Sequence, residues 1–247
     1  MSVRLSGPGQ YLAANVSIPP VGDTGHTVVG WVYLSDARSY YSSICRLAID
    51  SSSHFALETD TDGVSPWVFS SGGSFSSSAD LVEGAWSRVA LTITTARAGT
   101  LYVAAETGGA GVATGTTGNP GSPTHVTLGG RPDDSGDWFD GRIAQWRVYT
   151  AALAAGEIEA EWASPTPVRT TDLYADWPLT THTDLTDHSG HGHHLSAVGA
   201  GATTESDPPN VAAPDLGVSI WDGAAWAAAE VRLYDGDTWV PGGLIVS

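Results

Sequence analysis

The chain contains no lysine. All ten of its cations are arginine, and they are set against 27 acidic residues, so the formal net charge of the 247 residues is −17. A surface with this charge repels a phosphate backbone, which disfavours binding to nucleic acid. The same charge keeps a protein soluble and suits the weak binding of cations.

Cysteine is almost absent as well. With a single thiol, Cys45, the chain cannot form an internal disulfide. Cys45 lies in the strand-like run "SSICRLAID", where we expect a buried side chain that packs as a small hydrophobe rather than a catalytic nucleophile.

Long apolar runs are missing too. No stretch of about 18 apolar residues is present, so we expect no membrane-spanning helix. The residues after Met1, "SVRLSG", have neither the basic nor the apolar region of a secretory signal peptide, so we expect synthesis in the cytoplasm without one. Apolar residues make up 41% of the chain and charged residues 15%, which indicates a packed core rather than disorder.

The sequence is rich in strand-like alternation. Several segments repeat with a period of two, contain many β-branched and aromatic residues, and are bounded by Gly, Pro, Ser or Asp. These segments are residues 27–34, 54–59, 87–95, 99–106 and 142–150. Many strands of this kind predict an all-β sandwich or jelly roll.

One segment, residues 150–163, has helical spacing instead, and it is followed by Ser and Pro. Three apolar residues share one face of this predicted helix: Leu153, Ile158 and Trp162. Three glutamates are expected to point outward into solvent: Glu157, Glu159 and Glu161. The predicted fold class is therefore an all-β sandwich with one short helix.

The composition divides the chain into four parts. Residues 1–163 form the sandwich, 164–200 a linker with one added strand at 173–179, and 201–217 an extended linker. Residues 218–247 contain a repeat, in which "VSIWDGAAW" matches "VRLYDGDTW" thirteen residues later. Asp-Gly is a strong hairpin signal, so each repeat predicts a hairpin. We expect the aromatic residues of these hairpins to serve assembly; they are Trp221, Trp226, Tyr234 and Trp239.

The segment "VTLGGRPDDSGDWFDGRIAQWRVYTAALAAGEIEAEW" (126–162) closely resembles the C-terminal signature of laminin-G-like jelly rolls, within the concanavalin A-like superfamily. "WSRVALTITTARAGTLYVAAE" and "VRLSGPGQYLAA" resemble earlier strands of the family, in family order. The resemblance covers residues 2–163 and implies a concanavalin A-like sandwich. One departure is Ala144, which stands where the family usually carries an aspartate.

Five of the eight histidines lie in "HTDLTDHSGHGHH", residues 182–194. With the preceding "LYADWPL", this segment resembles the family's first strand, yet here it follows the helix. It either begins a second jelly roll or fills the first-strand position of the same one, and we favour the latter. We interpret Asp187, Ser189, Gly190 and Gly192 as a structural turn. The alternative is a zinc site, which needs three or four converging ligands.

Two acidic clusters invite a chemical interpretation. Glu58, Asp60 and Asp62 have a spacing similar to that of the carboxylates of some glucanases of this superfamily, but we favour a polar hairpin turn. The loop at 131–141 offers oxygen donors of the kind that Ca²⁺ prefers, and the alternative is an exposed acidic loop. The candidate calcium ligands are Asp133, Asp134 and Asp137, whereas Asp140 is expected to bond backbone.

Aromatic residues on loops are the candidates for glycan contact. They are Trp138, Trp67, Tyr40 and Tyr41, although Trp67 could equally be a core residue on a returning strand. Three further tryptophans sit inside strand patterns and are expected in the core; they are Trp31, Trp86 and Trp146.

The C-terminal "VSIWDGAAWAAAEVRLYDGDTWVPGG" resembles the ends of minor tail proteins from phages of GC-rich Gram-positive hosts. We therefore expect a non-enzymatic virion protein of the phage tail, whose lectin-like sandwich contacts host surface glycan. Its expected partners are other tail proteins and further copies of itself, and Ca²⁺ is its one candidate cofactor. The alternatives are a glycoside hydrolase using Glu58, Asp60 and Asp62, and a bacterial carbohydrate-binding module.

Overall fold

The computed structural model describes residues 1–37, 41–50, 52–106, 109–119, 121–131 and 137–205 in full. It also describes the backbone of residues 219–221, 226–228, 232–234 and 239–241. The chain divides into two compact units, Met1–Asn210 and Val211–Ser247.

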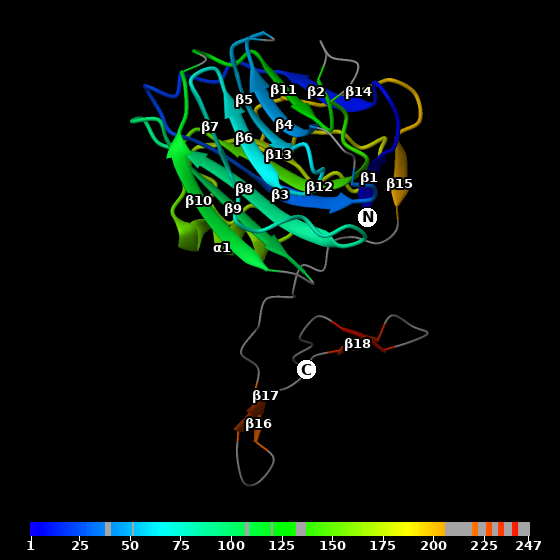
Figure 1. Cartoon of the computed structure of the whole chain (residues 1–247). Helices are drawn as coiled ribbons and strands as arrows, with labels where there is room; N and C mark the ends of the chain where they lie inside the picture. The colour runs from blue at the N-terminus through cyan, green and yellow to red at the C-terminus, as the bar shows by residue number, and fades with distance from the viewer. Residues whose placement is uncertain are drawn as a thin grey trace. The chain divides into compact units, whose positions relative to one another are not determined.

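The first unit is a sandwich of two antiparallel sheets (Figure 1). One sheet has the order β10 (Ala110–Thr116), β9 (Ala98–Ala105), β8 (Trp86–Ile93), β3 (His26–Leu34), β12 (Gly141–Tyr149), β1 (Ser2–Leu5) and β15 (Thr203–Glu205), with β13 (Leu173–Trp177) also on β12. The other has the order β14 (Ser196–Val198), β2 (Tyr11–Asn15), β11 (His125–Leu128), β4 (Ser42–Ala48), β5 (His54–Thr59), β6 (Pro66–Ser70) and β7 (Gly73–Ser76). The predicted all-β jelly roll with one helix is confirmed.

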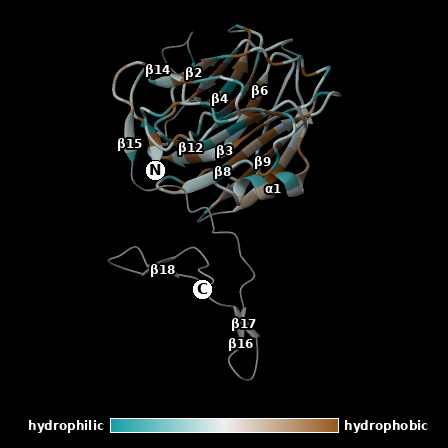
Figure 2. Cartoon of the chain, turned by 180° about the vertical axis from the view of Figure 1, so that it is seen from behind, coloured by the Kyte–Doolittle hydropathy of each residue, from teal (hydrophilic) through white to brown (hydrophobic). Residues whose placement is uncertain are grey.

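The alternation of the strands places one set of side chains between the sheets. On β5, Phe55 and Leu57 belong to the core, so the intervening Ala56 points to the outer face of its sheet. In Figure 2 the hydrophobic colour is concentrated on central strands of the sandwich, where it alternates with white and teal. The three tryptophans expected in the core are all buried. Trp146 lies between the sheets, whereas alternation places Trp31 and Trp86 on the outer face of the eight-stranded sheet.

Helix α1 (Ala155–Trp162) covers part of the outer face of the eight-stranded sheet (Figure 1). The helix is shorter than the predicted residues 150–163, so Leu153 lies just before it. Leu153, Ile158 and Trp162 still form one buried cluster with side chains of that sheet, as the predicted apolar face implied. The strand side chains of the cluster include Val29 and Ala90.

The expectation that Glu161 points into solvent is wrong. Its side chain is 1% exposed, and its Oε2 atom accepts a hydrogen bond of 2.8 Å from Nη1 of Arg147 on β12. Its Oε1 atom accepts the backbone N–H groups of Val168 and Arg169. A buried cation and two backbone donors thus replace water around this carboxylate. Glu159, by contrast, is exposed as expected.

Strand β13 lies beside β12, in the same sheet as the N-terminal strand. Residues 146–149 of β12 pair with β13, and residues 141–143 pair with β1. Strands β1 and β13 therefore lie end to end along one edge of β12, although they are far apart in the chain. The segment after the helix thus occupies a strand position in this sandwich.

The chain then closes the edge of the sandwich. Strand β14 pairs with β2 in the seven-stranded sheet, and β15 pairs with β1 in the other. Residues 203–205, which we expected within an extended linker, therefore form an edge strand instead. Between the two strands, Gly199 has a φ of 77°, and a Cβ atom there would lie 2.5 Å from the backbone oxygen of Gly9. This close crossing requires glycine.

The second unit contains two separate antiparallel strand pairs. β16 (Ser219–Trp221) pairs with β17 (Trp226–Ala228), and β18 (Arg232–Tyr234) pairs with β19 (Trp239–Pro241). Each copy of the sequence repeat corresponds to one strand pair.

Candidate functional site

The outer face of the seven-stranded sheet carries a continuous row of aromatic rings. The ring centroids of Tyr41 and Trp67 are 5.0 Å apart, those of Trp67 and Phe69 are 5.2 Å apart, and those of Phe69 and His54 are 5.3 Å apart. We call these four residues the aromatic row. Two of them, Tyr41 and Trp67, are among the residues predicted to contact glycan.

The sequence of β6 explains the position of this row. Val68 points into the core, so its neighbours Trp67 and Phe69 point to the outer face, opposite Glu58 and Ala56 of β5. Trp67 is half-buried and Phe69 is 36% exposed. The core alternative for Trp67 is therefore wrong. Sequence reasoning missed Phe69, although its position two residues after Trp67 was the available signal.

A polar pair lies at the buried end of the row. Nη2 of Arg46 lies 2.9 Å from Nδ1 of His54 and also donates to the backbone oxygen of Asp50 at 3.3 Å. The side chains of Arg46 and His54 are both buried. Because a guanidinium only donates, His54 accepts at Nδ1 and carries its proton on Nε2. Glu58 is also buried on this face, opposite Trp67.

Glu58, Asp60 and Asp62 do not line one face as a set of catalytic carboxylates would. Glu58 lies on β5, whereas Asp60 and Asp62 lie in the turn between β5 and β6. Asp62 accepts hydrogen bonds from the backbone N–H groups of Val64 and Ser65 and from the Ser65 hydroxyl. Burial opposes its ionisation, but these hydrogen bonds outweigh burial and lower its pKa. The polar turn that we expected is present.

Asp137 and Trp138 are two further predicted site residues, and both lie in the described part of the loop before β12. Trp138 forms an isolated bridge with Ser43 of β4, and Asp137 makes an ion pair of 2.6 Å with Arg131. Asp140, expected to bond backbone, has its Oδ1 atom 3.7 Å from a guanidinium nitrogen of Arg4. Three predicted residues lie outside the described part of the chain; they are Tyr40, Asp133 and Asp134. Calcium binding therefore stays a prediction.

The histidine-rich segment forms the turn that we expected. Asp187 accepts hydrogen bonds from the backbone N–H groups of Asp176, Ser189 and His193. Gly190 and Gly192 both have positive φ, which glycine adopts without strain. In the part of the chain that the structure describes, no group of three or more His, Cys, Asp or Glu side chains could hold a metal ion.

This turn covers the edge of β13 that faces away from β12. The backbone N–H of His188 donates to the oxygen of Asp176 at 2.7 Å, and the Ser189 hydroxyl donates to the oxygen of Tyr174 at 3.2 Å. These bonds take the place of a neighbouring strand.

The histidine rings themselves pack and bond within the turn. The ring of His193 stacks on that of Tyr174 with centroids 4.3 Å apart, and Nδ1 of His194 accepts the backbone N–H of Asp187 at 3.1 Å. Burial, the largest effect, lowers the pKa of His193. The segment that sequence reasoning weighed as a zinc site is therefore explained by turn formation.

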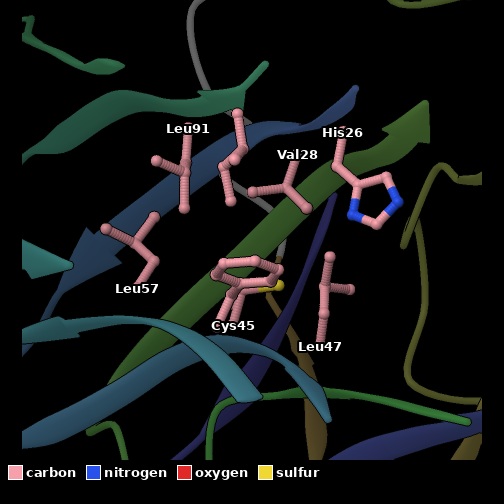
Figure 3. Close-up of a pocket in the computed structure, with 8 residues that line it drawn as sticks. His26, Val28, Cys45, Leu47, Leu57 and Leu91 are labelled. Carbon is pink, nitrogen blue, oxygen red and sulfur yellow. The ribbon is translucent and has the colours of Figure 1, made fainter. Parts of the chain in front are cut away.

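A small cavity lies inside the sandwich, between β3, β8, β4 and β5 (Figure 3). Its lining is apolar except for His26 and Cys45. Burial raises the pKa of the Cys45 thiol to about 12, so the thiol stays protonated, as expected of a packing residue. Burial lowers the pKa of His26, whose Nε2 atom bonds the backbone oxygen of Pro19 at 2.8 Å.

A protein-family model matches residues 6–159, and its description is the concanavalin A-like lectin/glucanases superfamily. The chain belongs to this superfamily. No curated protein matches the chain. Within the described residues, no helix has the length and apolarity that a membrane span needs.

Solved structures share the concanavalin A-like fold at low sequence identity. A candidate carbohydrate-binding protein from Bacteroides ovatus matches with a TM-score of 0.60 and 14% identity over 84% of this chain, which spans 62% of that protein. The heptameric SAP-like pentraxin of Limulus polyphemus matches with a TM-score of 0.53 and 15% identity, over 80% of this chain and 94% of that one. The enzymatically active domain of tailspike protein 2 from bacteriophage CBA120 matches with a TM-score of 0.54 and 16% identity, over 72% of this chain and 32% of that one.

Proposed function

We propose that this protein is a non-enzymatic glycan-binding component of a phage tail. The observation that carries the glycan-binding part is the aromatic row on the outer face of the seven-stranded sheet. Sites for small polar ligands combine apolar and aromatic surface with a few fixed polar groups. The row supplies three aromatic rings beside the buried Arg46–His54 pair.

Two observations support a place in the tail. The C-terminal repeats resemble the ends of phage minor tail proteins, and one structure with this fold belongs to a phage tailspike. In this proposal the sandwich contacts glycan on the host surface, while the repeats join the protein to neighbouring tail proteins or to further copies of itself. Decoration of purified tails by an antibody against the sandwich tests this placement, and an undecorated tail would contradict it.

The glycan-binding part is tested by titrating the protein with soluble fragments of host cell-wall polysaccharide in a calorimeter. We expect Trp67→Ala to weaken binding about tenfold, which corresponds to a loss of about 1.4 kcal/mol. The matched control is Tyr33→Ala, which removes a half-buried aromatic ring from the other sheet. Equal affinities in the native protein and in Trp67→Ala would contradict the proposal.

A hydrolase is the second candidate, and one observation favours it: the Glu58 carboxyl is buried on the same face as the aromatic row. A buried carboxyl can serve as a general acid when its pKa is raised. The proposal expects no reducing sugar to be released from these polysaccharides. Release by the native protein that Glu58→Gln abolishes would make the protein an enzyme.

A further inference from the structure

A polar groove lies on the seven-stranded sheet, at the edge away from the aromatic row. It is lined by Ala13 and Asn15 of β2, Ser196 of β14, and Gly192 and His194 of the histidine-rich turn, together with Ala14. Its volume is about 420 Å³. Sites for small ligands commonly measure roughly 300–1,000 Å³, so the groove has room for a sugar ring.

The depression follows from the sequence of neighbouring strands. Ser196, Ala13 and Thr127 lie side by side on β14, β2 and β11. Ser196 and Ala13 line the groove and have short side chains, whereas Thr127 is buried and is not part of the lining. The turn at 192–194 forms one wall, and its Gly192 leaves space, because a Cβ atom there would meet nothing within 4 Å.

Three hydrogen-bonding groups line this groove. His194 accepts the backbone N–H of Asp187 at Nδ1, so its neutral ring carries the proton on Nε2 and offers a donor. The Asn15 amide offers a donor and an acceptor, and the Ser196 hydroxyl offers both. Within the described residues, the Asn15 amide, the Ser196 hydroxyl and Nε2 of His194 make no hydrogen bond to protein.

We infer that this groove is a separate binding site for a neutral sugar ring, with Asn15, His194 and Ser196 as its hydrogen-bonding residues. Mixed donors and acceptors match adjacent hydroxyl groups, each of which donates and accepts. A neutral ligand fits a chain whose net charge of −17 disfavours anions.

The groove and the aromatic row cannot hold the same sugar ring. Three strand spacings separate β2 from β5, the nearer of the two strands that carry the row, which amounts to roughly 14 Å. The ligand class rests on the proposed glycan-binding function, but the two sites have independent reporters. Signals of the His194 ring report on the groove, and the indole signal of Trp67 reports on the row.

The test is nuclear magnetic resonance titration of the full chain with four probes: glucose, galactose, rhamnose and N-acetylglucosamine. We expect at least one probe to shift the signals of the His194 ring and the Asn15 amide in a saturable way. Ala13→Leu fills the floor of the groove from the outer face of β2 and leaves the turn intact. Ala13→Leu should weaken binding about tenfold, and so should His194→Ala, whose binding is measured from the shift of the Asn15 amide signal.

The matched control is His188→Ala, which removes an exposed ring from the same turn but not from the groove. It should keep its affinity, and so should Trp67→Ala. Shifts of the Trp67 signal without shifts at His194 or Asn15 would contradict sugar binding in the groove and leave the proposed function standing. Shifts at His194 that Trp67→Ala abolishes would overturn the claim of a separate site. Silence at both reporters would overturn both proposals.

Discussion

Asp187 organises its surroundings through several donors at once. It accepts the backbone N–H groups of Asp176, Ser189 and His193 and the hydroxyl of Ser189. Burial alone would raise its pKa, yet these hydrogen bonds lower it. A buried carboxylate with this many donors fixes the path of the turn and the position of β13 beside it.

Burial of His26 disfavours its protonated, charged form. His26 is buried in the cavity of Figure 3, and its Nδ1 atom has no partner among the described residues. The only other titratable group in the lining is Cys45, which stays protonated. Burial holds the pKa of His26 below 6.5, so the unfolded chain binds this proton more readily.

The contribution of His26 to stability is therefore fully present above about pH 6.5 and lost as the pH falls below that value. His26→Gln keeps a donor for Pro19 but cannot titrate. When the pH falls from about 7.5 to about 5, we expect the free energy of unfolding to decrease less for His26→Gln than for the native protein. Urea unfolding at both pH values measures this. His125→Ala, which removes an exposed histidine, should lose as much as the native protein, and an equal loss in His26→Gln would contradict the assignment.

Single residues were predictable where a local pattern defines their surroundings. The Asp-His-Ser-Gly sequence predicts the turn at Asp187, and the strand-like run around Cys45 predicts its burial. Alternation in "SPWVFSS" does not show which face of β6 meets the core, so the sequence alone decides the position of neither Trp67 nor Phe69. That choice depends on Val68 packing against the opposite sheet, which only the folded structure shows.

Among the elements, helix α1, β12 and β13 are joined by one buried arginine. Arg147 of β12 binds the Glu161 carboxylate at the end of the helix at 2.8 Å and lies 3.4 Å from the Asp176 carboxylate of β13. It also donates to the backbone oxygen of Ser164. Helical spacing alone predicts that Glu161 faces solvent. It carries no information about Arg147, whose position beside the helix is set by the sheet.

Removing Arg147 should leave two carboxylates buried without their cation. We expect Arg147→Met to lower the free energy of unfolding by about 3–5 kcal/mol, because such a substitution breaks a buried ion pair and leaves the partners in place. The control is Arg169→Met, which removes half-exposed ion pairs with Glu157 and Asp172 and should cost no more than about 1 kcal/mol. Chemical denaturation measures both, and similar losses in the two variants would contradict the role given to Arg147.

At the scale of the whole molecule, the sandwich uses strands from both ends of the first unit. Strands β1 and β13 share one edge of β12, and β14 and β15 close the edges beside β2 and β1. The family resemblance predicted the place of β13, since it matched the segment to a first strand. It could not predict β14 and β15, because three-residue edge strands carry too little alternation to stand out from a linker.

Two truncations separate the contributions of the C-terminal parts. A chain ending at residue 210 keeps the whole first unit and should melt within a few degrees of the full chain. A chain ending at residue 169 lacks β13, β14 and β15, so it uncovers part of β12 and loses the buried side chains of Ala175, Trp177 and Leu179. It should melt far lower or without a cooperative transition. Circular dichroism measures the melting temperatures. Equal melting temperatures for the two truncations would show that β13 is dispensable to the sandwich.

The chain ending at residue 210 also tests the assembly role proposed for the repeats. A concentration of aromatic residues on short strand pairs is typical of surfaces that become buried in an interface. If the repeats join copies of the protein, light scattering should give a smaller particle mass for this truncation than for the full chain. The double variant Trp226→Ala with Trp239→Ala should lower the mass in the same way while the sandwich stays folded. Equal particle mass with and without residues 211–247 would remove self-assembly from the function of the repeats.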